Sequence, residues 1–107
     1  MVKVDKAVKS DDAHGFNYFY GSEINAGDVI ILKMPMVTPN KRGINDIGVV
    51  YSGDIAVYGT LSKDYDDDNS IWQQIQPRDD VNKTVSYLKF INNGEVTGRI
   101  NVRIILN

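Results

Sequence analysis

β-Branched aliphatic residues dominate the apolar part of this chain. Valine and isoleucine together number 24, whereas leucine and alanine, the strongest apolar helix formers, number 4 each. Branched side chains pack well on a pleated sheet and lose rotamer freedom in a helix. The sequence therefore predicts an all-β protein.

Glycine and proline interrupt the chain at short intervals, as expected of many short strands joined by turns. A long loop is predicted over 36–45, which contains Pro39 and Gly43. The predicted strands span residues 16–21, 28–34, 47–51, 55–61, 71–76, 83–91 and 97–106. This pattern predicts a single antiparallel β-sandwich or partly closed barrel of six to eight short strands.

Two connections have the composition of tight hairpin turns. Ser52-Gly53-Asp54 lies between two predicted strands, and Asn92-Asn93-Gly94 supplies residues that tolerate the positive φ of a type I′ turn. In the last strand Ile100, Val102, Ile104 and Leu106 alternate with Arg99, Asn101, Arg103 and Ile105. One face of that strand is therefore predicted to be core and the other solvated or covered by a partner.

A chain of 107 residues has the length of one domain. We expect a polar N-terminal arm over residues 1–14 and a β-sandwich domain over residues 15–107. The N-terminus has no run of seven apolar residues, which a signal-peptide core requires, so no secretion signal is expected. No apolar run approaches the length of a membrane-spanning helix, so no membrane partner is expected.

The charge balance argues against nucleic acid as a partner. The formal net charge is −2, and binding driven by phosphate neutralisation needs a basic surface. Four cations could still form a patch that grips carboxylates at a protein interface. These candidate partner-binding residues are Lys41 and Arg42 in the predicted long loop and Arg99 and Arg103 in the last strand.

Residues capable of catalysis or metal binding are few. The chain has no cysteine, and its single histidine, His14, has no second imidazole to work with. Asp64, Asp66 and Asp68 have the spacing that begins a calcium-binding loop, but Asn69 and Ile75 stand where such a loop needs glycine and glutamate. We therefore expect a solvated acidic turn, no catalytic residue, no metal and no cofactor.

Two alternatives belong to other functional classes. A small carbohydrate- or receptor-binding module would expose Trp72 and one or two tyrosines in a row, because aromatic rings stack on sugar faces. An enzyme acting on a sugar or phosphoester would use Asp64, Asp66 or Asp68, with or without a divalent ion.

Residues 54–106 resemble small β-sandwich proteins encoded beside the capsid genes of tailed phages. The resemblance is carried by Tyr-Gly-Thr-Leu, by Trp-Gln and by a closing Val-x-Arg strand, in the segments 54–62, 71–73, 81–83, 86–92 and 98–106. It implies a non-catalytic structural or interaction protein of the virion that decorates or stabilises the capsid. It also implies a capsid protein as partner, assembly in many copies, synthesis in the host cytoplasm and localisation in the virion. Exposed strand edges favour a homo-oligomer as well.

Overall fold

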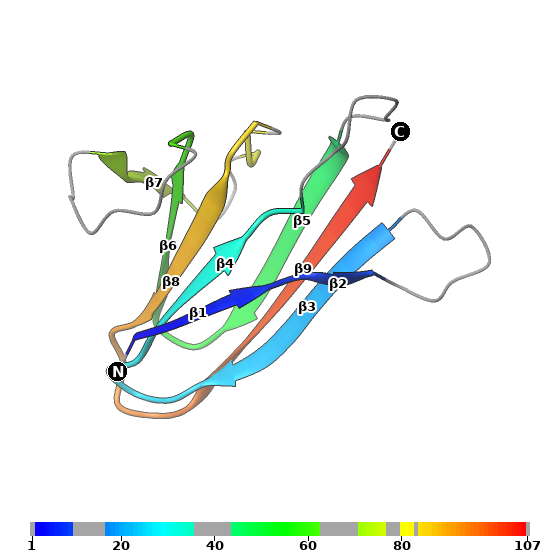
Figure 1. The fold of residues 1–107 in the computed structure, drawn as a ribbon. Coiled ribbons are helices and arrows are strands. Elements are labelled where there is room, and N and C mark those ends of the chain that lie inside the picture. The colour runs from blue at the N-terminus through cyan, green and yellow to red at the C-terminus, as the bar shows by residue number, and fades with distance from the viewer. Residues whose placement is uncertain are drawn as a thin grey trace.

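The computed structural model describes residues 2–9, 17–35, 44–62, 71–76, 80–82 and 84–106. These residues form strands and connecting turns arranged as two facing sheets (Figure 1). The strands are β1 (Val2–Lys6), β2 (Val8–Lys9), β3 (Asn17–Ile24), β4 (Val29–Lys33), β5 (Ile44–Ser52), β6 (Ile55–Thr60), β7 (Gln73–Ile75), β8 (Tyr87–Asn92) and β9 (Gly98–Leu106). The prediction of an all-β sandwich is confirmed.

One sheet has five strands and the other has four. The five-stranded sheet has the order β1-β4-β8-β6-β7, and the four-stranded sheet has the order β2-β3-β9-β5. Every pairing is antiparallel except that of β1 with β4, where Val2 lies beside Val29 and Lys6 beside Lys33. All seven strands predicted from the sequence are present with boundaries shifted by a few residues, and β5 extends into the predicted loop.

The N-terminal residues belong to the sandwich. The chain runs from β1 in one sheet directly into β2 in the other, so these two strands join the sheets along one side (Figure 1). Ala7, between the two strands, is buried in the main core. The prediction of a polar arm over 1–14 is therefore wrong for residues 2–9, because their backbone pairs with β4 and β3; residues 10–14 lie outside the described part.

Both predicted hairpins are instead connections between the sheets. β5 and β9 lie in the four-stranded sheet, whereas β6 and β8 lie in the five-stranded one. Among the described residues only Gly27 and Gly53 have positive φ, so the turn at Asn93 and Gly94 is not of type I′. Gly53 and Asp54 alone join β5 to β6, whereas residues 93–97 join β8 to β9. The physical reason is that turn composition sets which backbone angles are tolerated and not which sheet the next strand joins.

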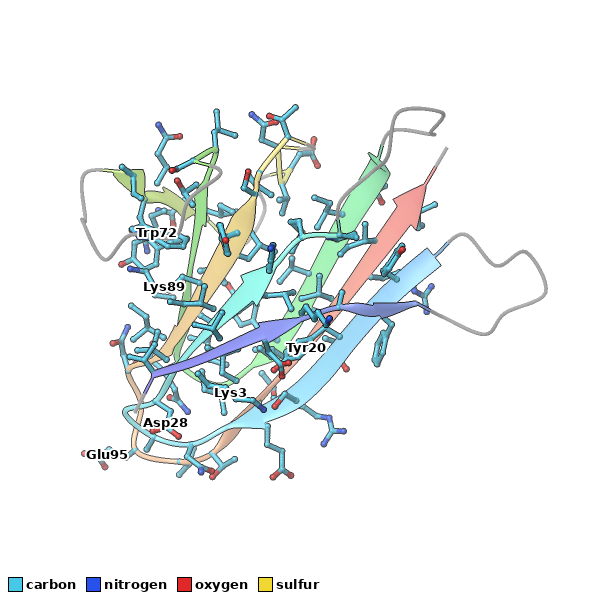
Figure 2. All side chains as sticks on the ribbon, viewed as in Figure 1. Lys3, Tyr20, Asp28, Trp72, Lys89 and Glu95 are labelled. Carbon is cyan, nitrogen blue, oxygen red and sulfur yellow. The ribbon has the colours of Figure 1, made fainter. Side chains whose placement is uncertain are left out.

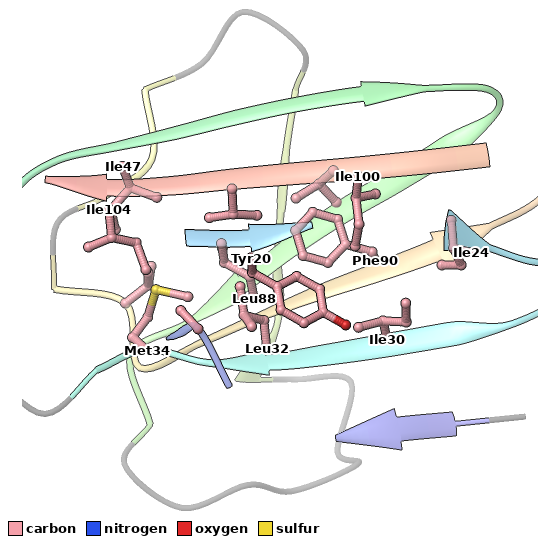
Figure 3. Close-up of a cluster of buried hydrophobic side chains, with 14 of the residues drawn as sticks. Tyr20, Ile24, Ile30, Leu32, Met34, Ile47, Leu88, Phe90, Ile100 and Ile104 are labelled. Atoms are coloured by element: carbon pink, nitrogen blue, oxygen red, sulfur yellow. The ribbon is translucent and has the colours of Figure 1, made fainter. Parts of the chain in front are cut away.

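The main core fills the space between the sheets (Figure 3). Phe90 and Leu88 of β8 and Ile100, Val102 and Ile104 of β9 are completely buried there. In β9 the predicted alternation is confirmed, since Ile100, Val102 and Ile104 are 0% exposed and Arg99 and Arg103 are exposed. No helix in the described part of the chain is long and apolar enough to cross a membrane.

Candidate functional site

The outward surface of the four-stranded sheet carries a mixture of apolar, cationic and amide side chains. Successive residues of a strand point to opposite faces, so the residues between the core positions of β3, β9 and β5 share this surface. We call it the exposed face. Its members are Phe19, Gly21, Glu23, Asp46, Gly48, Val50, Ser52, Arg99, Asn101, Arg103 and Ile105.

Phe19 lies along its own strand because Gly21 leaves room for the ring. A Cβ atom placed on Gly21 would lie 2.9 Å from Cζ of Phe19 and 3.1 Å from Oδ1 of Asn101. The ring therefore occupies the position above Gly21 and borders the Asn101 amide. With 46% of Phe19 exposed, this arrangement presents an apolar ring and a polar amide side by side.

Arg103 lies beside Phe19 in the sheet. The two residues are directly paired across β3 and β9, and Gly48 of β5 pairs with Arg103 on its other side. Gly48 has no side chain to cover the arginine. Within the described residues Arg103 has no ion-pair partner, so its guanidinium is available to a carboxylate of another molecule.

Arg99 also belongs to the exposed face and lies four residues before Arg103 on β9. Its Nη1 atom lies 3.8 Å from Oε1 of Glu23, which is directly opposite on β3. Both side chains are mostly exposed, at 62% and 69%, so the pair contributes little to stability. Glu23 neutralises Arg99, and the positive charge of the face is concentrated at Arg103.

Val50 is the second apolar side chain of the exposed face. It is 68% exposed and pairs with Asn101 across β5 and β9. Together with Phe19 it flanks the row of polar side chains on the central strand β9. A face with separated apolar residues around an arginine and an amide suits recognition of a protein surface.

The structure brings together only part of the predicted partner-binding set. Arg99 and Arg103 share the exposed face, whereas Lys41 and Arg42 lie outside the described residues. The set predicted from the sequence does not include Phe19, Val50 and Asn101. The alternation along β9 predicted which of its residues face outward. The register that places Phe19 and Val50 beside those residues depends on how the strands pair, which the alternation does not reveal.

Within the described residues, Trp72 and the tyrosines do not form the exposed row expected of a carbohydrate-binding surface. Trp72 is only 8% exposed and packs with Ile31 and Tyr87 on the outward side of the five-stranded sheet. Nζ of Lys89 lies 4.4 Å from the centroid of the Trp72 ring and 5.7 Å from that of Tyr58 (Figure 2). The burial of Trp72 argues against the carbohydrate-binding alternative.

The residues considered for catalysis or metal binding have no described structure. His14, Asp64, Asp66 and Asp68 all lie outside the described ranges. Within those ranges, no group of three or more histidine, cysteine, aspartate or glutamate side chains could hold a metal ion.

A small polar cluster lies where β1 meets β3. Asp5 accepts a hydrogen bond from the Lys6 backbone N–H at 3.0 Å, and its other oxygen lies 3.3 Å from Nζ of Lys3. Burial tends to raise the pKa of Asp5, but these two groups outweigh it and hold the pKa below its ordinary value. Burial raises the pKa of the Tyr20 phenol, whose buried oxygen has no hydrogen-bond partner although Ser22 and Asp5 lie near it.

Comparison with known proteins finds similar solved structures, including two of bacterial proteins, and no sequence family. No family model and no curated protein matches the chain. One structure is a mutant of PliG from Escherichia coli, described as a periplasmic lysozyme inhibitor of g-type lysozyme; it is 14% identical, with 99% of this chain and 98% of that chain covered and a TM-score of 0.44. The other is Salmonella Typhimurium PliG, described in the same terms, which is 16% identical, with coverage of 98% and 97% and a TM-score of 0.45.

These comparisons correct the expectation of a phage virion protein. Both similar structures are periplasmic bacterial proteins, and neither is a virion component. The predicted capsid-decorating function and virion localisation are therefore wrong. The Tyr-Gly-Thr-Leu pattern that suggested them begins on β6, and the Trp-Gln pattern lies at the beginning of β7. Both patterns are explained by their places in the five-stranded sheet. At TM-scores below 0.5 the likeness assigns no target to this chain.

Proposed function

We propose that this protein is a non-catalytic module that binds another protein through the exposed face of its four-stranded sheet. The observation that carries the proposal is the placement of Phe19 directly beside Arg103 on two paired strands, with no ion-pair partner for Arg103 among the described residues. Strand β9 lies inside the sheet, between β3 and β5, so the side chains that it presents are held on a rigid support.

The chemistry of the face favours a protein with an acidic patch. Aromatic and arginine side chains are enriched at the energetic centres of protein interfaces. Arg103 and the Asn101 amide can donate hydrogen bonds to carboxylates, while Phe19 and Val50 provide apolar contact on either side. Two arginines on a chain of net charge −2 are too few to bind a nucleic-acid backbone.

The test compares wild-type protein with a variant whose face is altered. Phe19→Ala combined with Arg103→Glu removes the ring and reverses the free charge without touching the core. Val96→Ala is the matched control, because Val96 is an exposed apolar residue at 70% in the turn before β9, away from the face. Circular dichroism establishes that all three proteins are folded.

Each immobilised protein is used to capture partners from extracts and secreted material of the source cells, and captured proteins are then purified for titration. We expect a partner that binds wild type and the Val96→Ala control and binds the face variant at least about tenfold more weakly, a loss of about 1.4 kcal/mol. Equal binding by wild type and the face variant would overturn the proposal. A g-type lysozyme serves as one defined probe, in an assay of its activity with stoichiometric protein, since it is the enzyme named for both similar structures.

A further inference from the structure

Strand β5 forms one edge of the four-stranded sheet. It pairs with β9 on one side, and no described strand pairs with it on the other. From Asp46 to Ser52 its register with β9 is continuous, and the only irregularity lies at its beginning, between Ile44 and Asp46. Along this regularly paired stretch every second residue directs its backbone N–H and C=O groups to the edge away from β9.

β5 lacks the sequence features that protect the other edge strands of the two described sheets. Such strands are usually short, or carry lysine, proline or a central bulge. The other edge strands of the two sheets follow this rule, because β2 and β7 have two and three residues and β1 carries Lys3 and Lys6. β5 has nine residues, INDIGVVYS, with no lysine or proline and with Asp46 as its only charge.

We propose that this edge pairs antiparallel with β5 of a second copy of the chain, about a two-fold axis at Val49. In this arrangement the two four-stranded sheets become one continuous sheet, and both exposed faces lie on the same side of it. Opposite residues in an antiparallel pair must point to the same face, so only registers that differ by two residues are possible.

Side-chain size selects the register centred on Val49. In that register Val50 of one copy lies opposite Gly48 of the other, and the reverse contact occurs on the other side of the axis. Val50 is 68% exposed, and the space that a side chain on Gly48 would occupy is open, with no atom nearer than the Arg103 backbone oxygen at 4.0 Å. Each exposed valine thus covers the gap left by the glycine of its neighbour.

Charge complementarity supports the same register. Asp46 of the second copy lies opposite Ser52. Ser52 in turn pairs with Arg99 on the neighbouring strand β9. Serine is small enough for the carboxylate to approach the guanidinium across it. Centring the pair on Val50 would carry Asp46 past the end of β5 at Ser52, and centring it on Gly48 would set Asp46 opposite Val50. Neither alternative gives the carboxylate a cationic row.

The inward side chains of β5 gain cover in the same pairing. They line a groove of ≈ 240 Å³ between the open edges of the two sheets, together with Val57, Ile75 and Val81. Val49 and Tyr51 are only partly buried there and pack against the main core. In the proposed pair Val49 meets Val49 of the second copy, and Ile47 meets Tyr51, so apolar surface at the groove is removed from water.

Sedimentation velocity over a range of protein concentrations tests the association directly. We expect the 12.0 kDa chain to convert to a species of twice that mass as concentration rises. Val50→Lys should weaken the association at least about tenfold, because each lysine would meet Gly48 of the other copy at a closely packed edge. Val96→Lys is the control, since Val96 is equally exposed but lies in a turn outside the sheet.

Cysteine cross-linking tests the register, because the natural chain has no cysteine. The double variant Gly48→Cys/Val50→Cys should form disulfide-linked dimers under mild oxidation, whereas either single variant should not. Cross-linking of Val50→Cys alone or of Gly48→Cys alone would establish a different register and overturn the proposal. A chain that stays monomeric at every concentration would also overturn it, even if a partner's strand were found on the same edge.

These readouts involve no other protein, so they are independent of the proposed partner binding. Phe19→Ala should leave the dimer intact, because Phe19 lies on β3, which β9 separates from β5. Loss of partner binding with retained dimerisation, or the reverse, therefore separates the two proposals.

Discussion

The side-chain amide of Asn92 donates a hydrogen bond to the backbone carbonyl of Ile24 at 2.9 Å, joining residues 68 positions apart in the sequence. The same amide nitrogen donates to the Val96 carbonyl at 2.9 Å, and Oδ1 accepts from the Gly94 backbone N–H at 2.9 Å. Asn92 is only 1% exposed. One buried side chain thus fixes the turn between β8 and β9 against the end of β3, where the chain crosses between the sheets.

Asn92→Ala should lower the free energy of unfolding by about 3 kcal/mol, since two carbonyl groups and one amide lose a partner and a small cavity forms. Urea denaturation followed by circular dichroism measures the change. Asn93→Ala is the matched control, because the neighbouring asparagine is exposed, and its effect should stay within about 0.5 kcal/mol. Similar stabilities for the two variants would contradict the role assigned to Asn92.

Lys89→Ala should destabilise the protein by about 1 kcal/mol. Its ammonium group lies over the Trp72 ring and near Tyr58, so the variant loses cation–π attraction as well as the packing of the aliphatic stem. Lys33→Ala, at an exposed position of β4, provides the comparison and should change stability by less than about 0.5 kcal/mol. Trp72 fluorescence should shift to longer wavelength in Lys89→Ala alone; an unchanged spectrum would argue against the stacking.

Tyr20→Phe should stabilise the protein by about 1 kcal/mol at neutral pH, because it removes a buried hydroxyl that has no hydrogen-bond partner. The ring itself remains in the core. Since burial raises the pKa of Tyr20 above 10.0, the unfolded chain loses the phenolic proton first as pH rises. Wild-type stability should therefore fall above about pH 10, and this fall should be smaller in Tyr20→Phe. Thermal unfolding at several alkaline pH values compares the two proteins.

Asp5→Asn should remove a component of acid sensitivity. The pKa of Asp5 is lower in the folded protein than in the unfolded chain, so its carboxylate contributes stability above about pH 4 that is lost as pH falls through the folded pKa. Wild type should be the more stable of the two at pH 7, and the difference should shrink steadily below about pH 4. A difference that does not vary with pH would show that the ionised form of Asp5 has no special stabilisation.

Gly98→Ala and Gly48→Ala should change stability in opposite directions. A Cβ atom on Gly98 would lie 2.6 Å from the Ser52 carbonyl oxygen and 2.9 Å from Cδ1 of Ile55, so the first variant should be destabilised by about 2 kcal/mol or more. Gly48 has open space around it, and alanine there should stabilise the strand by about 0.5 kcal/mol. Chemical denaturation in dilute solution measures the free energy of unfolding of both variants. Equal changes in the two variants would contradict the close approach at Gly98.

Much of the fold was readable from local patterns. The alternation of Ile100, Val102 and Ile104 with two arginines identified β9 and its faces, because side-chain direction has a period of two in any strand. The turns were less predictable: Asn93-Gly94 has the composition of a tight hairpin, yet the chain there crosses to the other sheet. Composition reports which backbone angles are tolerated, but it does not report which strand comes next to which.

The sequence by itself determined the all-β class, the approximate strands and the outward placement of Arg99 and Arg103, since these depend on residue type and spacing. The tertiary structure alone decided that Phe19 stands beside Arg103, that Trp72 is buried beneath Lys89 and that β5 is left as an open edge. These relationships depend on strand order and register, which arise from packing between segments far apart in the chain. Distant segments leave no local pattern from which their pairing can be read.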